Sequence, residues 1–306
     1  MKSPLLICMF VFAATGSFSQ AADSSTYYFE KGLAEKAEKR YKQAFHHFQK
    51  SLFFNKEHLG SLRESGLAAI EMKQYGLALA ALKKADTLEP NNPIVTETLA
   101  NLYFFTHRWD DAIRYALKMQ QLNLTGRSDY IIGRSFYEKE DYSKSFRYLD
   151  AAYKAEPNNA EIPYLFARSF VDMSNYKMAA KYYQEAIKLD SSKIRWIYEM
   201  AMAYSAIPDD KTAIVYYEMA AAKGYKMDND FIENLSTSYL LTGQPEKAID
   251  MMKQLLEKKP ADIELLYGLA DTYYRAGKYK EAIEYWDKVL FYDKQHARSL
   301  YMIGMS

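Results

Sequence analysis

The sequence predicts an all-α protein, a right-handed α-solenoid of antiparallel helix hairpins, on the basis of three observations. Similar sequence blocks recur about every 34 residues along most of the chain. Within each block, apolar residues recur at spacings of three and four, which is the period of an α-helix. The 306 residues include only 12 glycines and 8 prolines, fewer turn residues than a strand-and-turn protein needs. Because one hairpin cannot bury its apolar face alone, successive hairpins must stack on one another.

The first 21 residues have the features of a signal peptide. Lys2 supplies a positive start, and an uncharged apolar run follows at residues 5–14. Ser19 and Ala21 are small residues at the spacing that a signal peptidase reads. The apolar run is about half of the roughly 20 residues that span a bilayer as a helix, although an uncleaved anchor is the alternative. We therefore expect an exported protein, located in a periplasm or in the outside medium.

The charge and cysteine content exclude several classes of function. Forty basic residues stand against 39 acidic ones, whereas a general nucleic-acid binder or a polybasic membrane-surface protein needs a cationic face. The only cysteine, Cys8, lies inside the apolar run, so the mature chain would form no disulfide. The sequence has no second apolar segment long enough to span a membrane. We expect neither nucleic-acid binding nor membrane insertion after signal removal.

Pairs of similar blocks define the repeat. Gly-Leu-Ala occurs at residues 32–34 and again, 34 residues later, at residues 66–68. The segment at residues 269–283 resembles the segment at residues 235–249, at the same interval. Together these blocks place the starts of eight units near residues 25, 59, 93, 126, 160, 194, 229 and 263.

Each unit has a small residue at two fixed places. The eighth place is filled by Gly32, Gly66, Ala100, Gly133, Ala167, Ala201, Ser236 and Ala270. The twentieth place is filled by Ala44, Ala78, Ala112, Ser145, Ala179, Ala213, Ala248 and Ala282. This pattern resembles the tetratricopeptide repeat family, whose paired helices approach closely at small residues. The resemblance implies a TPR-like superhelix over residues 22–296, with residues 297–306 forming the start of a ninth repeat or a terminal helix.

Residue patterns typical of an enzyme or a metal site are missing from the sequence. The five histidines form no His-Glu-x-x-His motif and have no cysteine partners in the mature chain. No glycine-rich phosphate-binding motif and no Gly-x-Ser-x-Gly nucleophile elbow occurs. The repeats also leave no room for a separate catalytic domain. We therefore expect no catalytic residue, no cofactor and no bound metal.

The family resemblance also implies where a partner would bind. In this family the first helix of each hairpin lines a concave groove, and its second, fifth, ninth and twelfth residues point into that groove. Arginine and tyrosine are concentrated at these places in the fourth, fifth and sixth units: Arg127, Tyr130, Arg134, Tyr137, Tyr164, Arg168, Arg195 and Tyr198. Both residue types are enriched in binding hot spots. We therefore expect these eight residues to bind a segment of a partner protein.

The sequence leaves several alternatives open. The pairs Tyr130–Arg134 and Tyr164–Arg168 are each four residues apart, so they could stack on each other instead of binding a partner. Residues 297–306 offer an apolar face with little polar cover. That face favours either a fragment of a longer protein or self-association through the C-terminal end. The chain could also be the docking portion of a longer enzyme or receptor.

Overall fold

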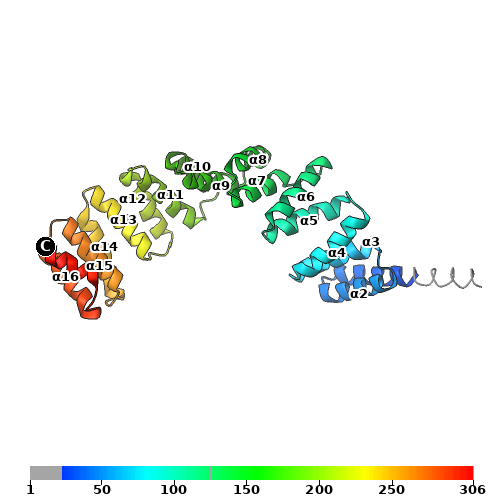
Figure 1. Cartoon of the computed structure of the whole chain (residues 1–306), viewed down its shortest axis with the longest axis horizontal. Coiled ribbons are helices and arrows are strands. Elements are labelled where there is room, and N and C mark those ends of the chain that lie inside the picture. Colours follow the sequence, from blue (N-terminus) through cyan, green and yellow to red (C-terminus); the bar gives the residue numbers. More distant parts are fainter. Residues whose placement is uncertain (1–22, 125, 306) are drawn as a thin grey trace, which may run out of the picture. The chain divides into compact units, whose positions relative to one another are not determined.

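The computed structural model describes residues 23–124 and 126–305, and over these residues it confirms the all-α prediction. Every regular element in the described ranges is a helix (Figure 1). The chain divides into two compact units, Met1–Ala152 and Tyr153–Ser306. The predicted signal peptide, residues 1–21, lies outside the described ranges.

The first unit is a stack of helix hairpins. Residues 23–37 are helical, and the helices that follow are α2 (Tyr41–Phe54), α3 (Leu59–Glu71), α4 (Tyr75–Leu88), α5 (Pro93–Phe105), α6 (Trp109–Gln121), α7 (Ser128–Glu138) and α8 (Tyr142–Ala155). The end of α8 belongs to the second unit. Within this unit α3 packs on α4 and α5 packs on α6, and α5 also contacts α7. The first helices of neighbouring hairpins therefore lie side by side.

The second unit repeats this arrangement. Its helices are α9 (Glu161–Asp172), α10 (Tyr176–Leu189), α11 (Ile194–Ala206), α12 (Asp210–Ala222), α13 (Asn229–Leu241), α14 (Pro245–Lys258), α15 (Ile263–Arg275), α16 (Tyr279–Tyr292) and α17 (Ala297–Met305). Each helix packs on the next, and α13 also contacts α15. Among the helices of the described residues, none has the length and apolar character needed to cross a membrane.

Small residues allow the two helices of a hairpin to cross closely. The residues of the twentieth place are fully buried: Ala44, Ala78, Ala112, Ser145, Ala179, Ala213, Ala248 and Ala282. At Gly133, a Cβ atom would lie 2.8 Å from Cγ of Leu149 and 2.9 Å from its backbone nitrogen. The hydroxyl of Ser145 donates a hydrogen bond to the Gly133 carbonyl at 2.9 Å. Because α7 and α8 meet backbone to backbone here, no larger residue fits without a shift.

The turn inside the hairpins follows one geometry that the sequence does not reveal. After α3, the Lys73 N–H donates to the Ile70 carbonyl and the Gln74 N–H donates to the Ala69 carbonyl, both at 2.8 Å. This is the Schellman motif, which usually places glycine at the residue with positive φ. In the part of the chain that the structure describes, eight hairpins have a positive φ at this place, and only two use glycine there: Lys39, Lys73, His107, Glu140, Ser174, Pro208, Gly243 and Gly277.

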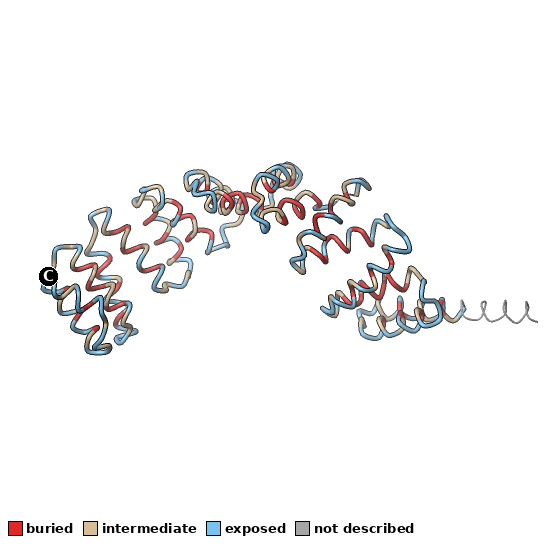
Figure 2. The backbone as a smooth tube through the Cα atoms, viewed as in Figure 1, coloured by how far each residue is buried: buried red, intermediate tan, exposed pale blue. Residues whose placement is uncertain are grey.

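The core of each unit runs along the faces where helices meet (Figure 2). Aromatic side chains fill much of it, and Tyr103, Tyr183, Tyr217 and Trp286 are almost completely buried. Buried tyrosines place their hydroxyl groups at the edge of the core, where carboxylates accept hydrogen bonds from them, as Glu199 does from Tyr183 at 3.2 Å. Many of the 28 tyrosines are therefore explained by packing alone.

Candidate partner-binding site

The predicted binding residues of α7 begin with an arginine laid over a buried tyrosine. Arg127 immediately precedes the helix, and its guanidinium carbon lies 4.3 Å from the centre of the Tyr130 ring. Tyr130 is only 5% exposed and contacts the Phe104 ring of α5 edge-on. Arg127 therefore covers Tyr130 through a cation–π contact, and little of the tyrosine remains for a partner.

The next turns of α7 are also packed internally. Arg134 forms an ion pair with Glu138 at 3.2 Å and a hydrogen bond with Tyr130. Burial alone would lower the pKa of Arg134, but these two contacts hold the pKa above its ordinary value. Tyr137 is half-buried with its ring against Tyr142. On α7 the predicted residues thus share one helix face, and each has a neighbour within the unit.

On α9, the predicted residues Tyr164 and Arg168 contact each other through the tyrosine hydroxyl. Arg168 donates a hydrogen bond from Nη1 to the Tyr164 hydroxyl at 3.2 Å. The Tyr164 ring stacks on Trp196 of α11, with 4.5 Å between ring centres and 17° between ring planes. These contacts hold the two side chains at the junction of two hairpins, where Arg168 is half-buried.

On α11, Arg195 is the most accessible of the predicted residues in this unit. Its side chain is 73% exposed, and its Nε donates to Oε1 of Glu199 at 2.8 Å. The hydrogen bond to Glu199 raises the pKa of Arg195, and burial raises the pKa of Tyr183, whose hydroxyl donates to the other Glu199 oxygen. Because the arginine is exposed, its ion pair contributes little to stability and can be exchanged for a ligand carboxylate.

Tyr198 joins α11 to the next hairpin. Its ring stacks on Tyr225 with 4.5 Å between ring centres and also lies against Phe231. Its hydroxyl accepts a hydrogen bond from Nδ2 of Asn234 at 3.1 Å. Burial raises the pKa of the Tyr198 hydroxyl above its ordinary value.

Three of the predicted residues line one concave region, which we name the arginine–tyrosine hollow. Its volume is about 560 Å³, and its lining includes Arg168, Arg195, Tyr198, Tyr176, Tyr225 and Met202. Ligand pockets usually measure about 300–1,000 Å³ and combine apolar walls with a few polar groups. The hollow has that size and composition, which suit an acidic side chain flanked by apolar ones.

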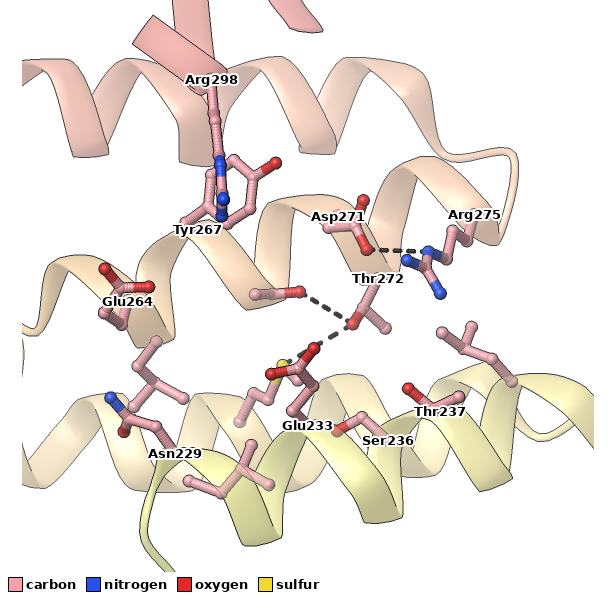
Figure 3. Close-up of a pocket in the computed structure, with 15 residues that line it drawn as sticks. Asn229, Glu233, Ser236, Thr237, Glu264, Tyr267, Asp271, Thr272, Arg275 and Arg298 are labelled. Atoms are coloured by element: carbon pink, nitrogen blue, oxygen red, sulfur yellow. Dashed lines mark hydrogen bonds and ion pairs between the residues drawn. The ribbon is translucent and has the colours of Figure 1, made fainter. Parts of the chain in front are cut away.

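A second pocket in the same unit was missed by the sequence reasoning. It lies between α13 and α15, and we name it the α13–α15 pocket (Figure 3). Several of its residues occupy the second, fifth, ninth or twelfth place of the seventh and eighth units: Glu233, Thr237, Leu240, Glu264, Tyr267 and Asp271. The same place rule identifies them once it is applied to every unit and not only where arginine and tyrosine cluster.

The described residues bring together no group of three or more histidine, cysteine, aspartate or glutamate side chains arranged to hold a metal ion. Their strongest pKa shifts belong to buried tyrosines. Burial and the hydrogen bond to Asp86 raise the pKa of Tyr115, and burial and the bond to Glu218 raise that of Tyr239. Tyr115 and Tyr239 lie outside the arginine–tyrosine hollow and stabilise hairpin junctions, whereas Tyr183, whose pKa burial also raises, is part of the lining of the hollow.

Models of known protein families match this chain over four segments, and all of the matching models describe the same repeat. Family models described as tetratricopeptide repeat match residues 64–92, 97–160, 160–193 and 239–302. These spans together cover more than half of the 306 residues. Tetratricopeptide repeat protein 8 of Mus musculus is 33% identical over 85 residues, which are 28% of this chain and only 16% of that protein.

Solved structures with the same fold are distant in sequence. The C-terminal part of a TPR repeat-containing protein from Cytophaga hutchinsonii matches with a TM-score of 0.55 and 15% identity, over 90% of this chain and 99% of that one. PilW, a widely conserved type IV pilus biogenesis factor, matches with a TM-score of 0.52 and 13% identity, over 70% of this chain and 97% of that one. At such identities the similarity shows the fold alone.

Proposed function

Because this chain belongs to the tetratricopeptide repeat family, we propose that it is a non-catalytic scaffold that binds a segment of a partner protein. Tetratricopeptide repeat proteins generally mediate protein–protein interactions, and their fold is typically a non-catalytic interaction scaffold. We place the partner on the first helices of the hairpins, with its main contact in the arginine–tyrosine hollow of the second unit.

The observation that carries this proposal is the exposed guanidinium of Arg195 beside a wall of tyrosine rings. An arginine can hold a carboxylate through two parallel hydrogen bonds, and tyrosine offers rigid contact area at low entropic cost. Arg168, on the neighbouring helix α9, adds a second positive charge to the same hollow, so that two arginines stand against the one carboxylate of Glu199 in its lining. The hollow therefore fits an acidic residue of the partner, with apolar neighbours lying against the half-buried rings of Tyr176 and Tyr225.

Affinity capture tests the proposal directly. The full chain and an Arg168→Ala/Arg195→Ala variant are immobilised, a native extract is passed over each, and retained proteins are identified by mass spectrometry. A Lys211→Ala/Lys280→Ala variant removes the same charge from exposed positions on α12 and α16 and serves as the control. We expect a protein that the natural chain and the control retain and the arginine variant loses. Equal retention by all three would contradict binding in the hollow.

Self-association is a second candidate, supported by the exposed apolar face of α17. Leu300, Tyr301 and Met305 are exposed there, whereas Ile303 packs against the core cluster around Trp286. Leu300→Asp therefore tests the surface without disturbing the core, and the solution mass from sedimentation is the measurement. If α17 mediates association, the natural chain is a dimer or larger and Leu300→Asp is a monomer. A natural chain that is monomeric at all concentrations contradicts this role.

We also propose that the protein is exported, because of the charge, apolar run and small residues at its N-terminus. In a bacterial host, the secreted or periplasmic form should begin at Ala22, as read by N-terminal sequencing. Leu6→Asp interrupts the apolar run and should leave the uncleaved chain in the cytoplasm. An uncleaved natural chain that fractionates with membranes would instead indicate an anchor.

A further inference from the structure

The α13–α15 pocket is small and partly lined by apolar side chains. Its lining includes the buried apolar side chains of Ile232, Leu265 and Met252. Arg298 of α17 lies at one side of the pocket (Figure 3). The pocket volume is about 160 Å³. A cavity of about 150 Å³ accommodates benzene, whereas pockets for drug-sized ligands measure about 300–1,000 Å³. The α13–α15 pocket therefore has room for one side chain and is too small for a nucleotide or a large cofactor.

Carboxylates dominate the rim of this pocket. Asp271 and Arg275 form an ion pair at 2.8 Å and neutralise each other. Within the described ranges of the chain, Glu233, Glu264 and Arg298 form no hydrogen bond or ion pair, although all three line the pocket. A ligand group thus meets two unpaired carboxylates and one guanidinium. An acidic group would be repelled more than attracted, and a basic group would be held.

Ser236 gives an independent sign that a polar ligand belongs here. It lines the pocket and is only 3% exposed, and in the described part of the chain its Oγ has no hydrogen-bond partner. Thr272, on the facing helix, is also buried, but its hydroxyl donates to the Gly268 carbonyl at 2.8 Å. Buried hydroxyl groups without partners are unfavourable and uncommon in folded proteins. The Ser236 oxygen is therefore open to a hydrogen bond from a bound group.

We propose that the α13–α15 pocket receives a basic side chain, lysine or arginine, from the partner segment. Its cationic end bonds to the carboxylates of Glu233 and Glu264 and to the hydroxyl of Ser236, and its aliphatic stem lies on Leu265 and Met252. A lysine ammonium has three donors and no acceptor, which matches three oxygen acceptors, and its stem is apolar. This inference rests on the proposed function, because the occupant belongs to a partner protein.

Direct titration tests the pocket without any partner. The methyl group of Met252 in the full chain is followed by NMR while Nα-acetyl-lysine amide or Nα-acetyl-arginine amide is added. Both compounds keep the charged side chain free. We expect a saturable shift of the Met252 signal with a millimolar Kd, as suits ligands of this size. The two titrations also decide which of the two basic side chains the pocket prefers. N-acetyl-norleucine amide, which lacks the charge, and N-acetyl-glutamate amide should cause no saturable shift.

Matched variants test whether Glu233, Glu264 and Ser236 are the groups that bind the lysine compound. Glu233→Gln/Glu264→Gln should weaken binding of the lysine compound about tenfold or more, because two charge-assisted hydrogen bonds are lost. Ser236→Ala should weaken it by a smaller factor without lowering the melting temperature, since the hydroxyl has no partner in the unliganded chain. Glu257→Gln/Glu284→Gln removes two exposed carboxylates from α14 and α16 and should bind as the natural chain does.

The results separate this inference from the proposed function. Equal binding of the norleucine and lysine compounds, or tighter binding of the glutamate compound, would overturn a basic-side-chain site. The inference also fails if a captured partner is lost with the arginine variant of the hollow but retained in full by Glu233→Gln/Glu264→Gln. In that case the scaffold function would stand.

Discussion

On α7, in the first unit, Tyr130 is buried against Phe104 and covered by Arg127, and Arg134 is tied to Glu138. On α11, in the second unit, Arg195 is exposed at the edge of a hollow. These residues occupy equivalent places in their repeats and are of the same two types. Arg127 and Arg195 are both exposed and Tyr130 and Tyr198 are both buried, but Arg127 lies over the Tyr130 ring, whereas Arg195 and Tyr198 line a hollow.

The difference arises from the neighbouring helices. In the first unit, Phe104 of α5 fills the space beside Tyr130. In the second unit, the lining of the hollow includes Val171 of the neighbouring helix α9 and Ala203 and Ala206 of α11 itself, all smaller than phenylalanine. A repeat place fixes the direction in which a side chain points, but the residues of adjacent hairpins decide whether solvent or a partner can reach it.

The largest effect is expected from Tyr130→Ala. Removing a buried aromatic ring leaves a cavity, so the free energy of unfolding should fall by about 3–5 kcal/mol, measured by urea denaturation followed by circular dichroism. Tyr137→Ala, on the same helix but half-buried, should cost clearly less. A loss below about 1 kcal/mol at Tyr130 would mean that the ring is not part of the core and is open to a partner.

The next largest effect is expected at Gly133, where α7 and α8 cross. Gly133→Ala places a methyl group 2.9 Å from the Leu149 backbone, so the free energy of unfolding should fall by about 1–3 kcal/mol despite the better helix propensity of alanine. Gly76→Ala is the matched control, because nothing lies within 4 Å of its Cβ position in α4. That variant should gain up to about 1 kcal/mol. Equal gains at both positions would show that the α7–α8 crossing relaxes.

A third pair of variants addresses the comparison itself. Arg127→Ala and Arg195→Ala each remove an exposed arginine, so each should change the free energy of unfolding by less than about 1 kcal/mol. In the capture assay, however, only Arg195→Ala should lower partner retention, by about tenfold, as expected for a binding hot spot. If Arg127→Ala lowers retention by the same factor, the α7 surface binds the partner too and the contrast between the regions is lost.

The smallest effect is expected from glycine substitutions at the hairpin turns, which should change the free energy of unfolding equally in both regions. Glu140, after α7, and Ser174, after α9, have positive φ at the hairpin turn. The left-handed conformation costs a non-glycine residue about 1–2 kcal/mol, and glycine avoids this cost. Ordering the more flexible glycine backbone costs about 0.5–1 kcal/mol, which offsets part of the gain. Glu140→Gly and Ser174→Gly should therefore each raise the free energy of unfolding by about 0.5–1 kcal/mol, measured by thermal denaturation. A gain at one turn alone would reveal strain particular to that hairpin.

Sequence alone was enough for the fold, because a repeated pattern constrains every copy at once. The period of about 34 residues set the alternation of helices, and α3, α5 and α15 begin at Leu59, Pro93 and Ile263, where the sequence places the starts of units. Local spacing of small and apolar residues is sufficient to specify a hairpin and its stacking face. The turn conformation could not be deduced, because lysine, glutamate and serine occupy a place that usually calls for glycine.

The candidate site was only partly accessible to sequence reasoning. The repeat places indicated the helix face that holds Arg168, Arg195 and Tyr198. The same places also mark Glu233 and Glu264, which were not among the predicted binding residues. Whether a side chain on that face is covered or open depends on residues more than 30 positions away, such as Asn234, whose amide reaches Tyr198. Helical periodicity reflects interactions between residues close in sequence. Hollows form where separate hairpins leave space between them, so only the tertiary structure determines where they lie.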